Sequence, residues 1–120
     1  QGVDLVLMAL ERMIGGELFV PKIPSMKVSD LIRILAPECR VRITGIRPGE
    51  KMHEIMLTTE ESRRAREFDD YYVILPEFVV GRFKDEYSQG RPFEQDFAYQ
   101  SNSNERWLDE AGLKALLALA

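Results

Sequence analysis

Residues 3–22 read VDLVLMALERMIGGELFVPK, and this stretch decides the fold class. Its first part places apolar residues three and four positions apart, which predicts an amphipathic helix over residues 3–14. The two glycines that follow end this helix, because glycine adopts the left-handed conformation of a helix end without steric cost. Residues 18–20 are three β-forming residues in a row and predict a short buried strand. A helix that leads into a strand indicates a mixed α/β protein.

The next segments continue this alternation of helix and strand. Ser25 suits the N-cap of a second helix, which we expect to end before Pro37 because a residue that precedes proline disfavours the helical conformation. Residues 40–46 then alternate, with Val41 and Ile43 on one side and arginines on the other. This period of two predicts a half-buried strand.

The second half of the chain is less regular. Residues 51–57 fit either a short helix or a strand. A capping box that starts at Thr58 predicts a helix over residues 59–66, and residues 71–75 are rich in β-formers and predict a strand. We expect residues 81–105 to form a loop. A last helix begins near Asp109, where glycine replaces the usual capping-box partner.

Composition narrows the possible functions. The chain has 120 residues, 45% of them hydrophobic, which fits one globular domain. Its formal net charge of -4 argues against a nucleic-acid partner, which requires a basic face. No apolar run reaches the roughly 18 residues of a membrane span. The single cysteine, Cys39, fits a reducing compartment, and we expect a cytoplasmic protein.

Several kinds of reactive site are missing from the sequence. It contains no glycine-rich phosphate-binding loop, and no tyrosine followed four residues later by lysine that could act as an acid/base pair. The only histidine is His53, which excludes a histidine-rich metal site. We therefore assign no catalytic, cofactor-binding or metal-binding residue to this chain.

One short motif can bind a ligand. Arg47-Pro48-Gly49-Glu50 follows the strand expected at 40–46, and its central Pro-Gly suits a type II turn. Arg47 carries a planar cation that suits phosphate oxygens, and Glu50 carries acceptors that suit a ribose diol. The same spacing also fits an ordinary surface turn in which the two side chains pair with each other.

Three strings resemble a known family. Residues 15–26 read GGELFVPKIPSM, residues 45–54 read GIRPGEKMHE, and residues 69–74 read DDYYVI. In this order they resemble the carboxy-terminal part of the inverting UDP-N-acetylglucosamine 4,6-dehydratases, which are extended short-chain dehydrogenases/reductases of the polysaccharide-biosynthesis family. The similarity runs over nearly the whole chain.

The resemblance implies a two-lobed enzyme. An amino-terminal Rossmann lobe holds NADP and the acid/base residues, and a smaller lobe holds the UDP-sugar. The resemblance gives Arg47 a contact with the diphosphate and Glu50 a contact with the uridine ribose. It also implies that residues 1–24 pack on the Rossmann lobe and that residues 25–120 belong to the substrate lobe. We expect a single carboxy-terminal fragment without the main Rossmann lobe, which is inactive alone and binds no NADP.

Two alternatives to this function remain open. The chain can be a non-catalytic interaction module whose surfaces bind a partner chain, or part of another nucleotide-sugar epimerase or dehydratase. Under the family assignment we expect a homo-oligomer, because the helix at 3–14 and the strand at 17–21 lose their Rossmann neighbours.

Overall fold

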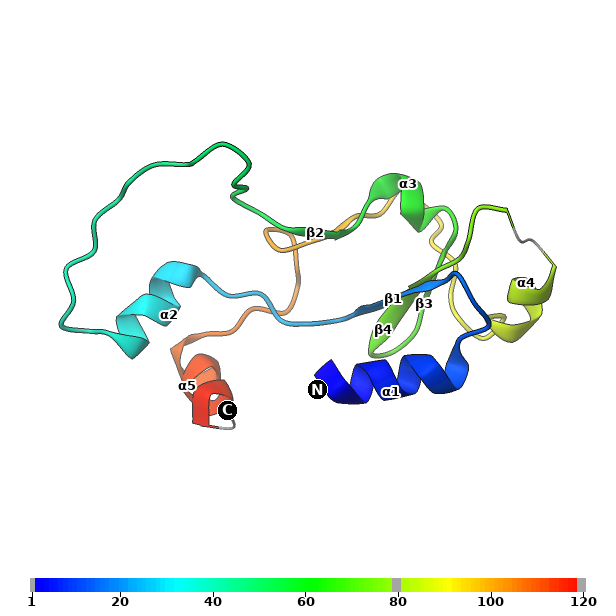
Figure 1. Ribbon diagram of the computed structural model, residues 1–120, viewed down its shortest axis with the longest axis horizontal. Coiled ribbons are helices and arrows are strands. Elements are labelled where there is room, and N and C mark those ends of the chain that lie inside the picture. Colours follow the sequence, from blue (N-terminus) through cyan, green and yellow to red (C-terminus); the bar gives the residue numbers. More distant parts are fainter. Residues whose placement is uncertain (1, 79–80, 119–120) are drawn as a thin grey trace. The chain divides into compact units, whose positions relative to one another are not determined.

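The chain folds into two compact units. The structure is a computed structural model that describes residues 2–78 and 81–118. Unit 1 comprises residues 1–22 and 56–99, and unit 2 comprises residues 23–55 and 100–120. Figure 1 shows the order of the helices and strands along the chain. The arrangement is a small mixed α/β fold, as the sequence predicts.

Unit 1 is built around a three-stranded antiparallel sheet in the order β1-β4-β3. These strands are β1 (Leu18–Pro21), β3 (Ala65–Glu67) and β4 (Tyr71–Ile74). In the central strand, Val73 lies opposite Phe19 of β1 and Arg66 of β3. Three helices complete the unit: α1 (Gly2–Arg12), α3 (Thr59–Ser62) and α4 (Arg82–Glu86).

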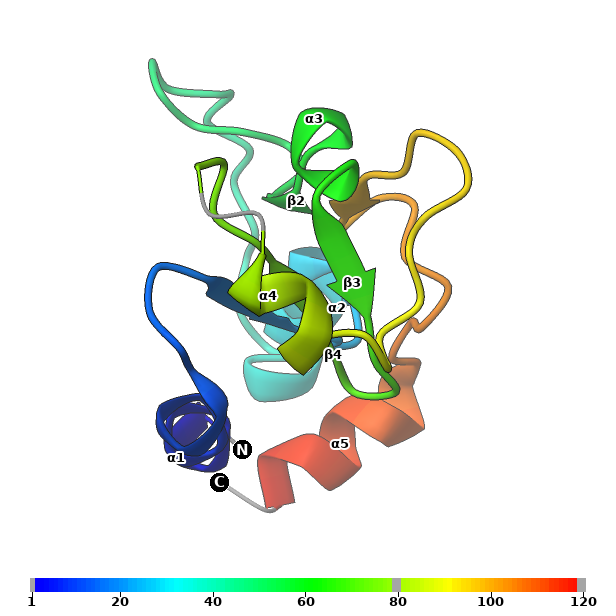
Figure 2. The same ribbon diagram turned by 90° about the vertical axis from the view of Figure 1, so that its right-hand side faces the viewer.

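The core of unit 1 lies on both faces of this sheet. All four residues of β4 are buried, and successive side chains of a strand point to opposite faces. Val73 belongs to one cluster with Phe83 of α4, and Met8 of α1 packs against that cluster. Figure 2 views the molecule from the side on which α4 lies. Tyr72 and Ile74 belong to the other cluster. A strand buried on both faces explains why the sequence at β4 is uniformly apolar or aromatic.

Unit 2 contains the helices α2 (Val28–Leu35) and α5 (Glu110–Ala118). The Ser25 N–H donates to the Arg106 carbonyl over 2.7 Å, and the Leu108 N–H donates to the Ser25 carbonyl over 2.9 Å. Among the described residues of this unit, Leu113 is the buried hydrophobic side chain. A second, two-stranded sheet pairs β2 (Ile55–Leu57) with β5 (Tyr99–Gln100), and each of these strands contains a residue pair at which the chain passes from one unit to the other.

Most local predictions are confirmed. The helix expected at 3–14 is α1, the strands expected at 18–20 and 71–75 are β1 and β4, and the last helix begins next to Asp109. The ambiguous segment at 51–57 forms a strand, β2, at its end. Asp109 still caps α5 without a capping-box partner, because its Oδ1 accepts from the Gly112 N–H over 2.8 Å.

Three predictions about where helices and strands lie are wrong. Ser25 is not the N-cap of α2, since Lys27 occupies that position and the Ser25 backbone pairs with the segment around Trp107. The helix predicted over 59–66 ends at Ser62, because pairing with β4 draws the next residues into β3. The loop predicted over 81–105 contains α4 and β5.

The strand predicted at 40–46 is also wrong for this structure. These residues form neither helix nor strand, and no backbone hydrogen bond joins them to another described residue. Ile43, which the predicted half-buried strand places on its covered face with Val41, is 92% exposed. An alternating pattern states only a preference for a pleated surface. A strand also needs a neighbour to accept its backbone hydrogen bonds, and the described residues provide none here.

Candidate functional site

The turn at Arg47–Glu50 has the geometry that its sequence predicts. The Glu50 N–H donates to the Arg47 carbonyl over 3.0 Å and closes a four-residue turn. Gly49 has φ +88°, the left-handed value that the third residue of a type II turn requires. Pro48 fits the position before it because its ring fixes φ near the value needed there. The chain therefore presents Arg47 and Glu50 at the two ends of one tight turn.

The two predicted site residues lie close together and open to solvent. The Arg47 N–H donates to Glu50 Oε2 over 2.8 Å, and Arg47 Nε lies 4.0 Å from Glu50 Oε1. The second distance is too long for a hydrogen bond. The side chains are 78% and 52% exposed, so an ion pair between them contributes at most about 1 kcal/mol. This pairing leaves the Arg47 guanidinium available to an anion.

The neighbourhood of the turn is basic, although the whole chain is acidic. From Arg40 to Lys51 the sequence contains four basic residues and one acidic residue, Glu50. Arg40, Arg42 and Arg47 are all exposed. A local excess of exposed cations attracts an anionic ligand, and arginine can bind phosphate oxygens through two parallel hydrogen bonds.

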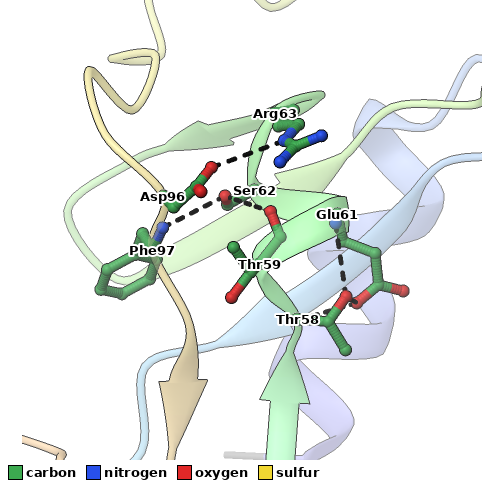
Figure 3. Close-up of polar contacts among 7 residues, drawn as sticks. All are labelled: Thr58, Thr59, Glu61, Ser62, Arg63, Asp96 and Phe97. Atoms are coloured by element: carbon green, nitrogen blue, oxygen red, sulfur yellow. Dashed lines mark hydrogen bonds and ion pairs between the residues drawn. The ribbon is translucent and has the colours of Figure 1, made fainter.

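A second polar cluster, around α3, serves the fold (Figure 3). Thr58 and Glu61 form the predicted capping box: the Glu61 N–H donates to Thr58 Oγ1 and the Thr58 N–H donates to Glu61 Oε2. The backbone and then the side-chain hydrogen bond from Thr58 lower the pKa of Glu61. Ser62 is buried and bonds at 2.7 Å to the Thr59 carbonyl and at 3.3 Å to the Phe97 N–H. These groups satisfy one another and hold the segment around Phe97 against α3.

A third cluster joins residues far apart in the sequence. The Tyr87 hydroxyl donates to Glu17 Oε1 over 2.7 Å, and the same carboxylate accepts the backbone N–H groups of Ile14 and Gly15. Burial raises the pKa of Glu17, but hydrogen bonds from Tyr87 and the backbone outweigh burial and lower it overall. Burial and the neighbouring Glu17 carboxylate raise the pKa of Tyr87. A tyrosine with a raised pKa is a poor source of phenolate near neutral pH, so Tyr87 is a poor candidate for a catalytic base.

Spacing along the sequence does not link Tyr87 to Glu17 in this third cluster, because the two residues are 70 positions apart. Arg12 Nη1 also donates to the Tyr71 hydroxyl over 2.7 Å. Arg12, Tyr71 and Tyr87 line a cavity of about 300 Å³ on unit 1. Glu17, directly after Gly15-Gly16, is the one local sign of this cluster, because a carboxylate at that position can accept hydrogen bonds from the backbone N–H groups of the turn.

Other kinds of site find no support in the described part of the chain. Residues 2–78 and 81–118 contain no group of three histidine, cysteine or acidic side chains placed to hold a metal ion. Cys39 is exposed and forms no disulfide. In the same ranges, none of the helices has the length and apolar character needed to cross a membrane.

Comparisons with known proteins identify relatives. Residues 1–76 match the family described as polysaccharide biosynthesis protein. Over 97% of its length the chain is 41% identical to the inverting UDP-N-acetylglucosamine 4,6-dehydratase of Campylobacter jejuni, and it spans 36% of that enzyme. Over 60% of its length it is 34% identical to the UDP-glucose 4-epimerase of Rickettsia canadensis, of which it spans 22%.

A solved structure agrees with the fold. The X-ray structure of Pen from Bacillus thuringiensis matches 98% of this chain with a TM-score of 0.76, at 23% identity and over 34% of its own chain. At this identity the likeness shows a shared fold alone. The family match covers well over half of the 120 residues. The chain therefore belongs to the polysaccharide biosynthesis protein family, and its relatives include UDP-N-acetylglucosamine 4,6-dehydratases and UDP-glucose 4-epimerases.

Proposed function

We propose that this chain is the nucleotide-sugar-binding part of an NADP-dependent UDP-N-acetylglucosamine 4,6-dehydratase. The proposal rests on one observation: the guanidinium group of Arg47 is exposed, on a tight turn that also presents Glu50. A UDP-sugar has the matching groups, since its diphosphate is a bidentate anion and its ribose has two adjacent hydroxyls. The 41% identity to a dehydratase over almost the whole chain supports the choice of substrate.

The two ends of the turn bind different parts of the nucleotide. The Arg47 guanidinium binds diphosphate oxygens, and the Glu50 carboxylate accepts hydrogen bonds from the ribose. One oxygen of Glu50 is held by the Arg47 N–H over 2.8 Å, which fixes the direction of the carboxylate before the ligand arrives. Binding exchanges the weak contact between Arg47 Nε and Glu50 for charge-assisted hydrogen bonds to phosphate, which are stronger.

The remaining chemistry belongs to parts of the enzyme that this chain does not span. NADP bound there would supply hydride transfer to and from the hexose. This chain orients the nucleotide, and we propose that it neither binds NADP nor dehydrates sugar by itself. The Campylobacter jejuni dehydratase is about three times as long, since this chain spans 36% of it. The free cysteine, Cys39, supports a site of action in the cytoplasm.

An exposed apolar stripe on α1 supports an additional role in assembly. Val3, Val6, Leu7 and Leu10 are all exposed, although their spacing is that of a buried helix face. We propose that residues 1–24 pack on the Rossmann lobe of the complete enzyme. Alone, the chain covers this stripe with a second copy, so sedimentation at high concentration is expected to show a homo-oligomer. A strictly monomeric chain would contradict self-association.

Steady-state kinetics test the nucleotide site. In the enzyme that carries this chain, Arg47→Ala is expected to raise KM more than it lowers kcat, because the diphosphate lies far from the bonds that change. Loss of a charge-assisted contact costs about 1.5–3 kcal/mol, which is roughly a 10- to 150-fold loss in kcat/KM. Arg47→Lys keeps the positive charge but lacks the planar guanidinium that forms two parallel hydrogen bonds, and it is expected to recover part of this loss.

Arg63→Ala is the matched control. Arg63 is 69% exposed and lies 3.5 Å from Asp96, so like Arg47 it is an exposed arginine beside a carboxylate, but it lies outside the turn. Its KM is expected to stay unchanged. If Arg47→Ala also leaves KM unchanged, the turn is a surface turn and nothing more. The 4-keto product of UDP-N-acetylglucosamine distinguishes a dehydratase from an epimerase, which yields no 4-keto sugar.

A further inference from the structure

Residues 40–46 have the sequence of a strand and the surroundings of a solvated loop. Val41 is 70% exposed and Ile43 is 92% exposed, whereas the alternation of the sequence calls for one covered face. Figure 1 shows this part of the chain between α2 and β2 without helix or strand. A strand-prone segment with unpaired backbone groups is a template for pairing with another segment.

Unit 2 also lacks the apolar burial that would hold this segment in place. Its buried hydrophobic side chain, within the described residues, is Leu113 of α5. Val28 and Leu35 of α2 are exposed, as is Ile46 next to the turn. Exposed apolar side chains of this kind are available for another segment to cover.

We propose that residues 40–46 become a β-strand by pairing with a strand from the part of the enzyme that this chain does not span. The proposal rests on the proposed function, because it places the partner strand in the same enzyme. The partner carries apolar residues opposite Val41 and Ile43, and acidic residues opposite Arg40 and Arg42. Opposite charges across a strand pair stabilise it.

A second copy of the chain fits this segment poorly. The antiparallel register that pairs residues 40–46 with themselves is centred on Ile43 and places Arg40 opposite Ile46 and Arg42 opposite Thr44. Neither arginine then faces an acidic side chain that would stabilise the strand pair. This chain spans only 36% of the dehydratase relative, so an enzyme of that length contains other segments that could supply the partner strand.

Pairing also has a consequence for the nucleotide site. Arg47 follows residue 46 directly, so the strand fixes the backbone from which the turn begins. An unpaired segment presents Arg47 in many orientations, and the ligand must then select one of them. We expect strand formation to orient the turn and to strengthen UDP binding.

Hydrogen exchange measured by mass spectrometry tests the pairing. The 120-residue chain is compared with the natural polypeptide that carries its sequence. Amides of residues 41–46 are expected to exchange at nearly the unstructured rate in the first. In the second, the amides that bond to the partner strand should be slower by on the order of 100-fold or more. Fast exchange in both proteins would overturn the proposal.

Two substitutions at one exposed position identify the partner. In the natural polypeptide, Arg42→Glu is expected to remove most of the protection of residues 41–46, and Arg42→Lys is expected to keep it. Equal protection in the two variants would overturn the charge pairing. Protection that rises with protein concentration would show a second copy as the partner, which also overturns the proposal. If Arg47→Ala raises KM while residues 41–46 stay unprotected, the strand is refuted and the nucleotide site stands.

Discussion

Removal of one buried hydroxyl is expected to destabilise unit 1. Ser62 is 2% exposed, and its Oγ lies 2.7 Å from the Thr59 carbonyl and 3.3 Å from the Phe97 nitrogen (Figure 3). Ser62→Ala deletes both hydrogen bonds at once. The Phe97 N–H then loses its partner in a part-buried position.

The expected cost follows from these contacts. A buried donor left without a partner costs about 1–3 kcal/mol. The bond to Phe97 is long, which favours the lower part of this range, and alanine is the better helix former by a few tenths of a kcal/mol. We therefore expect Ser62→Ala to lower the free energy of unfolding by about 1–2 kcal/mol, which for a chain of this size lowers Tm by several degrees.

Urea unfolding followed by circular dichroism measures this cost, with Ser88→Ala as the control. The Ser88 hydroxyl also donates to a carbonyl, that of Asp85, over 2.7 Å, but it is exposed and water can replace it. The control is expected to stay within about 0.5 kcal/mol of the parent. If Ser62→Ala costs no more than Ser88→Ala, the hydroxyl does not hold Phe97 against α3 and the reasoning fails.

Three further predictions concern a core residue, the turn and pH. Leu57→Ala should cost about 2–5 kcal/mol in urea unfolding because Leu57 is fully buried, while the exposed neighbour Met56→Ala costs much less; equal costs would contradict the assigned core. Gly49→Ala should cost about 1–2 kcal/mol because φ is +88°, and it should raise KM as well; an unchanged Tm and KM would exclude the left-handed turn. The folded protein lowers the pKa of Glu61, so the ionised carboxylate stabilises the fold. This stabilisation is fully present above the ordinary pKa of about 4.3 and is lost as the pH falls through the lowered pKa. The Tm difference between the parent and Glu61→Gln should therefore shrink in acid, and a difference constant from pH 7 to pH 3 would refute the assignment.

The sequence predicted elements whose causes are local. The apolar residues of α1 and the capping-box residues Thr58 and Glu61 are only three or four positions apart in the sequence. The Pro48-Gly49 turn is equally local, and its observed φ follows from the glycine. Where a helix stops depends on more distant pairing, which is why α3 ended at Ser62 and residue 65 entered β3 instead.

Long-range contacts account for what the sequence did not predict. Tyr87 meets Glu17 across 70 positions, and no period or spacing in the sequence links them. The strand expected at 40–46 fails for the opposite reason, since its pattern is present and its partner is not among the described residues. The positions of Arg47 and Glu50 were predictable from the turn, whereas their proposed roles came from the family resemblance.

The two units separate the sources of stability from the proposed site. Unit 1 contains both hydrophobic clusters and the fully buried strand β4. Unit 2 contains the turn with Arg47 and Glu50, and its described hydrophobic burial is that of Leu113. A substitution in β4 therefore removes packing that the chain itself supplies, and it should lower stability whether or not a ligand is present. A substitution at residues 40–50 removes little packing, because these residues are exposed. Except at Gly49, whose positive φ itself disfavours a side chain, its effect should appear in nucleotide affinity, and in stability only when a partner strand or a ligand covers the segment.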